Sequence, residues 1–170
     1  MGLAQDLKTI VKAADLLSGY DIYFQFIGEG VCKSELEMLA KPFSKKINFH
    51  NSTNRYELIK FIKRSSVCLV PLKNKKLFDL ALPSKMFEYM ACSKPIIAGV
   101  RGEVKKIVNN SNAGITVEPE DPAMLSKAIL TYYNDDEKCK IDGYNGMNYV
   151  TKKLSKEVLI SNVINQVKKC

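Results

Sequence analysis

VCLVPL at residues 67–72 and PSKMFEYMACSKPIIAG at residues 83–99 are the two stretches that decide the fold. The first is a short, continuously apolar run, which predicts a buried β-strand. Residues 95–99 repeat that pattern after a helix predicted over 83–91. Continuously apolar strands joined by helices are typical of a parallel sheet that is covered on both faces. These stretches therefore predict a β-α-β unit of a doubly wound α/β domain.

The same alternation of strands and helices extends over the rest of the chain. Asn54 with Glu57, and Asp121 with Pro122, are typical of helix starts. The fold predicted is a doubly wound, mostly parallel Rossmann-like sheet with extra C-terminal helices. The further strands are expected at 22–27, 47–50 and 114–117, and the further helices at 3–17, 33–40, 54–64, 103–108, 121–133, 137–150 and 155–168.

Composition narrows the class of protein. No apolar run approaches the roughly 20 residues that span a bilayer, and the N-terminus MGLAQDLKTI lacks the features of a signal peptide. Five widely spaced cysteines and a single histidine, His50, exclude a zinc site of ordinary spacing. We therefore predict one cytoplasmic domain with reduced thiols and no metal.

The charge of the 170-residue chain is strongly basic, with 26 Lys and Arg against 18 Asp and Glu, a formal charge of +8. Such a surface suits nucleic acid, an anionic membrane face or a phosphate-bearing ligand, or it is simply a solvated lysine-rich surface. Only three of the basic residues are arginines, and they are not clustered among aromatic residues. Nucleic acid is therefore not expected as a partner.

The helix predicted after residues 67–72 is the best candidate for a ligand site. Ligands of doubly wound folds bind at the carboxyl ends of the strands, where helix N-termini offer free amides to a phosphate. Pro83 opens this helix, Lys85 adds a cation, and Glu88 lies one turn further on the same face, where it can accept bonds from a ribose diol. The alternative from physics alone is an amphipathic helix with a surface Lys–Glu pair.

The order P-S-K-x-F-E-Y-M-A-x-x-K-P-I-I-A resembles the donor-binding motif of glycosyltransferase family 4, retaining enzymes of the GT-B fold. The similarity is closest to the branch that uses amino-sugar donors in surface polysaccharide synthesis. It extends over nearly the whole chain as a C-terminal, nucleotide-sugar-binding domain. The further landmarks are GLAQ at 2–5, FIGEG at 26–30, NAG at 112–114 and EPED at 118–121.

The resemblance implies roles for particular residues. Glu88 matches the second glutamate of the family's E-x7-E motif, which binds the nucleotide ribose. The segment from Leu82 through Pro83, Ser84 and Lys85 would approach the donor diphosphate and sugar. The resemblance further places Gly2 near the distal phosphate and Gly28 and Gly30 beside the nucleoside, and it assigns no catalytic residue.

The departures from the family pattern are equally specific. Leu80 stands where the first glutamate is expected, and Asp79 substitutes for it only if the loop shifts by one residue. Ala4 and Gln5 replace the Arg/Lys pair of many relatives. His50 is interpreted as a structural residue, with a role near the nucleobase as the alternative. The cations that replace the missing Arg/Lys pair would come from four lysines, among which the sequence does not choose: Lys73, Lys75, Lys76 and Lys85.

The resemblance implies transfer of a glycosyl unit to a polysaccharide or lipid-linked acceptor. The expected donor is a UDP-sugar, with a GDP-sugar as the second choice. No D-x-D motif is present, so neither metal nor another cofactor is expected. The implied enzyme works in the cytoplasm, with peripheral contact at the anionic inner face of the membrane.

The resemblance also implies that the chain is a fragment. It starts inside the glycine loop, so the family's first strand and its acceptor-binding N-terminal domain would be missing, and the chain alone would be inactive. We expect a donor-binding domain over residues 1–150 and a helix over 151–170 that packs on the missing domain. The neighbours of the missing strand would close up, pair with another chain or leave exposed edges.

Two other functions compete with this one. A nucleotide-sugar 2-epimerase of the same architecture would carry several histidines and arginines in its cleft, and the single His50 argues against it. A basic α/β module that binds an anionic partner would need a clustered basic face and would leave the ordered landmarks unexplained.

Overall fold

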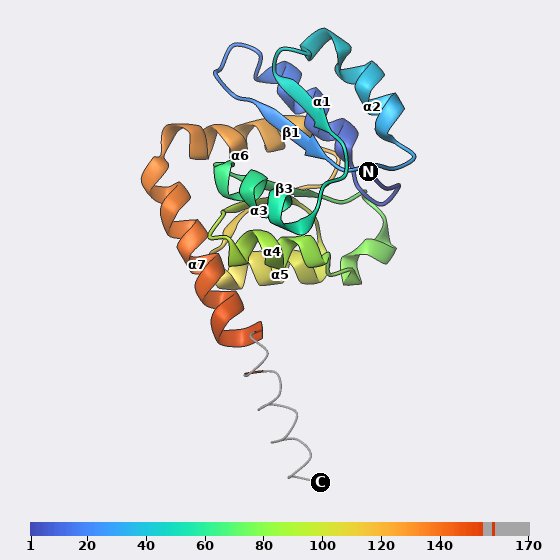
Figure 1. Ribbon diagram of the computed structural model, residues 1–170. Coiled ribbons are helices and arrows are strands. Elements are labelled where there is room, and N and C mark those ends of the chain that lie inside the picture. The colour runs from blue at the N-terminus through green and yellow to red at the C-terminus, as the bar shows by residue number, and fades with distance from the viewer. Residues whose placement is uncertain (155–157, 159–170) are drawn as a thin grey trace.

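The structure, a computed structural model, describes residues 1–154 and 158. Strands and helices alternate along this part of the chain as predicted (Figure 1). The helix expected at 155–168 lies outside the described residues, Val158 excepted. The strands are β1 (Phe24–Ile27), β2 (Ile47–His50), β3 (Cys68–Pro71), β4 (Ile96–Gly99) and β5 (Gly114–Val117); the helices are α1 (Leu7–Leu16), α2 (Lys33–Ala40), α3 (Arg55–Arg64), α4 (Ser84–Ala91), α5 (Gly102–Ser111), α6 (Pro122–Asn134) and α7 (Asp136–Leu154), with the short 3-10 helices η1 (Lys41–Phe43) and η2 (Lys76–Leu80).

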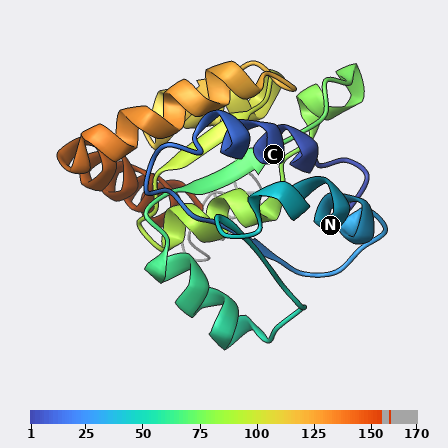
Figure 2. The same ribbon diagram turned by 90° about the horizontal axis from the view of Figure 1, so that it is seen from above.

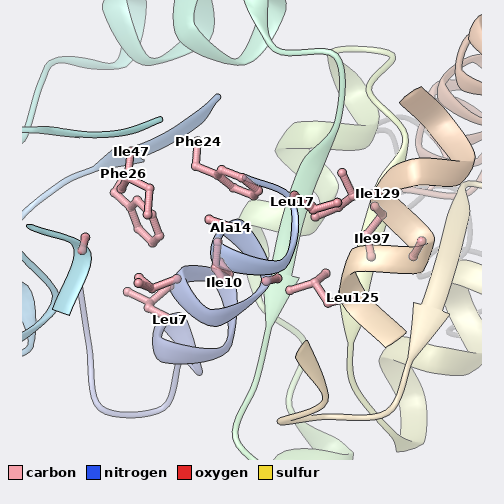
Figure 3. Packing of buried hydrophobic residues seen from close by; sticks show 14 of the residues in the cluster. Leu7, Ile10, Ala14, Leu17, Phe24, Phe26, Ile47, Ile97, Leu125 and Ile129 are labelled. Atoms are coloured by element: carbon pink, nitrogen blue, oxygen red, sulfur yellow. The ribbon is translucent and has the colours of Figure 1, made fainter. Parts of the chain in front are cut away.

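All strand pairs are parallel, which confirms the predicted fold class, but the described strands form two sheets. β1 pairs with β2, and β3, β4 and β5 form the second sheet in that order. Apolar side chains of α1 fill the space between the two sheets, where they meet Phe24 and Phe26 of β1 and Ile97 of β4 (Figure 3). Hydrophobic packing therefore joins the sheets where backbone pairing does not, and the alternative of closed-up neighbours is not realised.

The three-stranded sheet is covered on both faces. Side chains alternate across a strand, so Ile97 packs with α1 and α6, whereas Ile96 and Ala98 face a second core with α4 and α5. Met86 and Met90 of α4 are fully buried in that second core. Figure 1 shows these layers, with α6 on one side of the sheet and α4 and α5 on the other, and Figure 2 gives the view along the direction in which the layers are stacked.

Two predicted helix starts are confirmed, and two other helices begin later in the sequence than predicted. Asn54 and Asp121 cap their helices, because their side chains accept bonds from the amides of Glu57 (3.0 Å) and Met124 (2.8 Å). The helix predicted from residue 3 begins only at Leu7, since residues 2–5 form a turn. Pro83 is the N-cap of α4, so the helix begins one residue later than predicted.

Within the described chain, no helix combines the length and hydrophobicity required to cross a membrane.

Candidate functional site

The loops that follow the strands converge at one edge, called here the carboxyl edge. The N-terminal loop contacts the loop after β1, since the Met1 ammonium donates to the Glu29 carbonyl and the Cys32 amide donates to the Met1 carbonyl (3.4 Å). It also contacts the loop after β3, where the Lys73 amide donates to the Ala4 carbonyl (3.1 Å). Three of the segments singled out in the sequence therefore lie side by side.

The glycines of these loops differ in what they require. Gly28 and Gly30 have φ angles of +120° and +144°, a region that favours glycine. A Cβ on Gly30 would also overlap the backbone of Met1, whereas a Cβ on Gly28 or Gly2 would meet open space. Gly30 is thus explained by the fold alone, while Gly2 leaves open backbone at the carboxyl edge.

The start of α4 presents free donors and one unpaired cation. The first intrahelical bond there runs from the Met86 amide to the Pro83 carbonyl (3.0 Å), so within the described chain the amides of Ser84 and Lys85 have no partner. The Lys85 side chain is half-buried, and that burial lowers the pKa of its ammonium. Among the described residues it forms no hydrogen bond or ion pair, so the start of α4 carries positive potential that no protein group neutralises.

Glu88 does not neutralise the charge of Lys85. It lies one turn along α4 and is exposed, and no ion pair joins it to Lys85 within the described chain. The surface Lys–Glu pair that was the alternative interpretation of this helix is therefore not formed. Both side chains remain available to a ligand.

Asp79 and Leu82 belong to the segment between β3 and α4. Leu82 is exposed, and Asp79 lies in η2, where its backbone packs against Gly102 at the start of α5. A Cβ on Gly102 would overlap that backbone. No contact within the described chain joins Asp79 to Lys85 or Glu88, so its role in place of the first motif glutamate remains a prediction.

The loops after β1 and β2 are joined by Lys33. Its ammonium donates to Glu29 (2.8 Å) and Asn51 (2.7 Å), and this bond holds the pKa of the Glu29 carboxyl below its usual value. His50, at the end of β2, has structural partners: its Nε2 lies 2.6 Å from Oε1 of Gln25, and its ring packs on Phe61. These contacts agree with the structural interpretation of His50.

A cluster around Arg101 was not predicted. Its guanidinium donates to the Glu118 carboxylate (2.8 Å) and to the side-chain oxygen of Asn74 (3.0 Å). The backbone amide of Asn74 donates to the Glu120 carboxylate (3.1 Å). The arginine also holds the pKa of the Glu118 carboxyl below its usual value. It thereby ties together the loops after β3, β4 and β5. An arginine directly after an apolar strand was the available signal, but its partners lie 17 and 27 residues away in the sequence.

Metal ligands are not assembled in this part of the molecule: no group of three or more His, Cys, Asp or Glu residues in the described chain could hold an ion.

Comparison with known proteins identifies the family. The model of the family described as "Glycosyl transferases group 1" matches residues 2–149. The chain belongs to that family. The predicted glycosyltransferase family is thereby confirmed, whereas the assignment to family 4 and to its amino-sugar branch remains a prediction.

Relatives of this group 1 domain are longer than the chain. An uncharacterized glycosyltransferase of Methanocaldococcus jannaschii is 29% identical over 150 residues, which are 88% of this chain and 41% of that protein. The chain thus spans about two fifths of the length of this curated relative.

Two solved structures share the fold. The C-terminal domain of a group 1 family protein, LpcC of Francisella tularensis, has a TM-score of 0.75 at 21% identity and is covered to 84%, with 92% of this chain aligned. HepE of Anabaena, solved with UDP and glucose, has a TM-score of 0.77 at 13% identity, over 98% of this chain and 45% of HepE. At these identities the likeness concerns the Rossmann-like fold of one half of a GT-B enzyme.

Proposed function

We propose that the chain is the nucleotide-sugar-binding domain of a retaining glycosyltransferase. The reaction transfers a glycosyl unit from a UDP-sugar to a polysaccharide or lipid-linked acceptor. UDP ranks before GDP because of the resemblance described above, and HepE, which shares the fold, was solved with UDP and glucose. The donor residues proposed are Gly2, Gly28, Gly30, Asp79, Leu82, Pro83, Ser84, Lys85 and Glu88.

The single observation that carries this proposal is that the Lys85 ammonium and the amides beside it at the start of α4 have no partner among the described residues. A half-buried cation loses hydration, and an anion placed against it restores the lost interaction. A diphosphate also accepts bonds from the amides, which are aligned with the helix dipole. In the transfer step the same groups would stabilise the nucleoside diphosphate as it leaves the sugar.

Glu88 is proposed to accept hydrogen bonds from the two ribose hydroxyl groups. Three residues of α-helix rise about 4.5 Å, so the Glu88 carboxylate can reach the ribose of a nucleotide whose phosphates lie at Lys85. Its lack of any partner in the described chain keeps the carboxylate free for this role.

Calorimetric titration tests both parts of the site. The wild-type chain should bind UDP and UDP-N-acetylglucosamine more tightly than GDP, in EDTA as well as without it. It should prefer UDP to 2′-deoxy-UDP by about tenfold, the value of one charge-assisted hydrogen bond. Glu88→Gln should remove that preference, and the matched control Glu37→Gln, at an exposed position of α2, should retain it. A folded sample that binds no nucleotide would contradict the proposal.

Complete turnover is proposed to need more than this chain. Residues 1–150 would form the donor domain, which would work together with a separate acceptor-binding domain. The support is the length of the M. jannaschii relative, of which the chain covers 41%. The 170-residue chain should therefore bind the donor and yet transfer no sugar. Appreciable transfer to any glycan or lipid-linked acceptor by the isolated chain would refute this division.

A further inference from the structure

Arg101 lies at the centre of a network that joins three loops of the carboxyl edge. Its Nε and Nη2 both lie 2.8 Å from Oε2 of Glu118, in the loop after β5. Its Nη1 donates to Oδ1 of Asn74 (3.0 Å), in the loop after β3, and the backbone amide of Asn74 donates to Oε1 of Glu120 (3.1 Å). The contacts form a closed triangle between the loops, and every nitrogen of the guanidinium takes part in it.

The backbone on both sides of Arg101 is fixed. The amide of Val100 donates to the carbonyl of Val117 (3.2 Å), which continues the pairing of β4 with β5. Gly102 has a φ angle of +63°, and a Cβ there would overlap the backbone of Asp79, in the segment between β3 and α4 (residues 73–82, the β3–α4 segment). The arginine therefore projects from a point that both the sheet and the β3–α4 segment hold in place.

The network leads to residues proposed to face the phosphates and the sugar of the donor. The amide of Lys73, directly before Asn74, donates to the carbonyl of Ala4 (3.1 Å), which belongs to the same turn as Gly2. Further along, the β3–α4 segment carries Asp79 and leads into the start of α4. The arginine itself forms no hydrogen bond or ion pair with a proposed donor residue in the part of the chain that the structure describes, so it acts on them through these loops.

The residues proposed to contact the nucleoside are held by other contacts. The Lys33 ammonium joins the loops after β1 and β2 through Glu29 and Asn51. Glu88 lies on α4, whose position is fixed by the burial of Met90 in the second core. Loss of the arginine network should therefore disturb the phosphate side of the site and leave the nucleoside side in place.

The network is too exposed to contribute much to folding. The side chains of Arg101 and Glu118 are 49% and 41% exposed, and water screens an ion pair at such a position. Contacts that link three loops and yet add little to stability are suited to setting where those loops lie.

We propose that Arg101 is a positioning residue for the donor site: it holds the β3–α4 segment and the turn containing Gly2 where both can meet the diphosphate of a nucleotide sugar. This role rests on the proposed function. It requires the shape of the guanidinium as well as its charge, because the planar fork donates to Glu118 and Asn74 at once. A lysine ammonium is a compact point charge and does not reproduce that fork.

Two substitutions separate position from charge. Arg101→Lys keeps the charge, and Asn74→Ala removes the bond to the arginine without changing any charge. Both should weaken UDP binding about fivefold or more, because binding must restore the order that the bond supplied, and both should change uridine binding less than about twofold in NMR titrations. A merely structural role would weaken both ligands alike.

Lys106→Gln is the matched control. It removes an exposed ion pair of α5, between Lys106 and Glu103 (2.7 Å), that joins no loops. Its ratio of UDP to uridine affinity should equal that of the wild type. An unchanged ratio in Asn74→Ala, or wild-type UDP affinity in Arg101→Lys, would overturn the proposal.

Hydrogen exchange tests the network without any ligand. In nucleotide-free protein, the amides of residues 73 and 74 should exchange faster in Arg101→Lys and Asn74→Ala than in the wild type, whereas the amide of Ala128, buried in α6, should keep its rate. Equal rates at residues 73 and 74 in all three proteins would refute the positioning role. Variants that bind UDP as tightly as a wild type that binds it refute this role alone, and a wild-type chain that binds neither ligand refutes the proposed function as well.

Discussion

Lys85→Met should separate ligand binding from stability at the proposed donor site. Lys85 is half-buried at the start of α4 and has no partner within the described chain. A lysine that served the fold would lose an interaction on substitution. Here the substitution removes only a charge that burial disfavours, and methionine keeps most of the apolar stem.

Lys85→Met should weaken UDP binding without lowering the free energy of unfolding. Hydrogen bonds to a charged group contribute about 1.5–3 kcal/mol, so UDP should bind roughly 10- to 150-fold more weakly to the variant. The free energy of unfolding should be equal to that of the wild type or higher by up to about 1 kcal/mol, because the desolvation cost of the ammonium is gone.

The pH dependence offers an independent check. Burial lowers the pKa of Lys85 in the folded protein below its usual value of 10.5, so the unfolded chain binds more protons between the two pKa values. The contribution of Lys85 to stability therefore rises with pH through that window, and Lys85→Met should lose this contribution.

Calorimetric titration with UDP measures ligand binding, and urea denaturation followed by circular dichroism measures stability. Lys127→Met, at an exposed position of α6, is the matched control. A variant that binds UDP like the wild type, or that unfolds more easily by 1 kcal/mol or more, would refute the assignment of Lys85 as a ligand cation.

Three further predictions concern the fold. Met90→Ala should lower the free energy of unfolding by about 2–5 kcal/mol in urea, because Met90 is fully buried in the second core; Met38→Ala, at an exposed position, should change it by less than about 0.5 kcal/mol. Burial raises the pKa of the Cys68 thiol to about 12, so at pH 8 a thiol reagent should label Cys68 only after unfolding, and rapid labelling of the folded protein would contradict the buried position. Burial and the bond to Asp142 raise the pKa of the Tyr132 hydroxyl above its usual value of 10.0; the folded state then holds its proton longer than the unfolded state, and stability should fall as pH rises past 10. Tyr132→Phe should lose about 1 kcal/mol at pH 7 and show a flatter decline between pH 9.5 and 11, whereas an unchanged decline would assign that pH dependence to other groups.

The order of strands and helices was readable from local patterns. Residues 47–50 and 114–117 form strands with the predicted bounds, and residues 33–40 form a helix with the predicted bounds. Each of these elements is defined by neighbouring residues, through apolar runs, caps and glycine stops. The boundary at residue 3 was placed wrongly because a helical spacing of leucines also continues into a turn whose leucine faces solvent.

The sequence predicted individual residues of the candidate site but not the contacts between them. The position of Lys85 near a helix start followed from Pro83 and the preceding apolar strand. Its lack of an ion pair with Glu88 could not be predicted, because an i,i+3 spacing permits a pair without requiring one. The bonds of Arg101 to Glu118 and Asn74 depend on which loops the strand order brings together.

The sequence by itself determined the parallel α/β class, the loops proposed to bind the donor and the glycosyltransferase resemblance, since all three depend on short-range patterns. Only the tertiary structure decided that the described strands form two sheets joined by α1, that Lys85 has no partner among the described residues, and that Leu77 and Leu80 are exposed while Phe78 packs inward. These properties arise from contacts between segments far apart in the chain, and the burial and pairing of a side chain are set by such contacts.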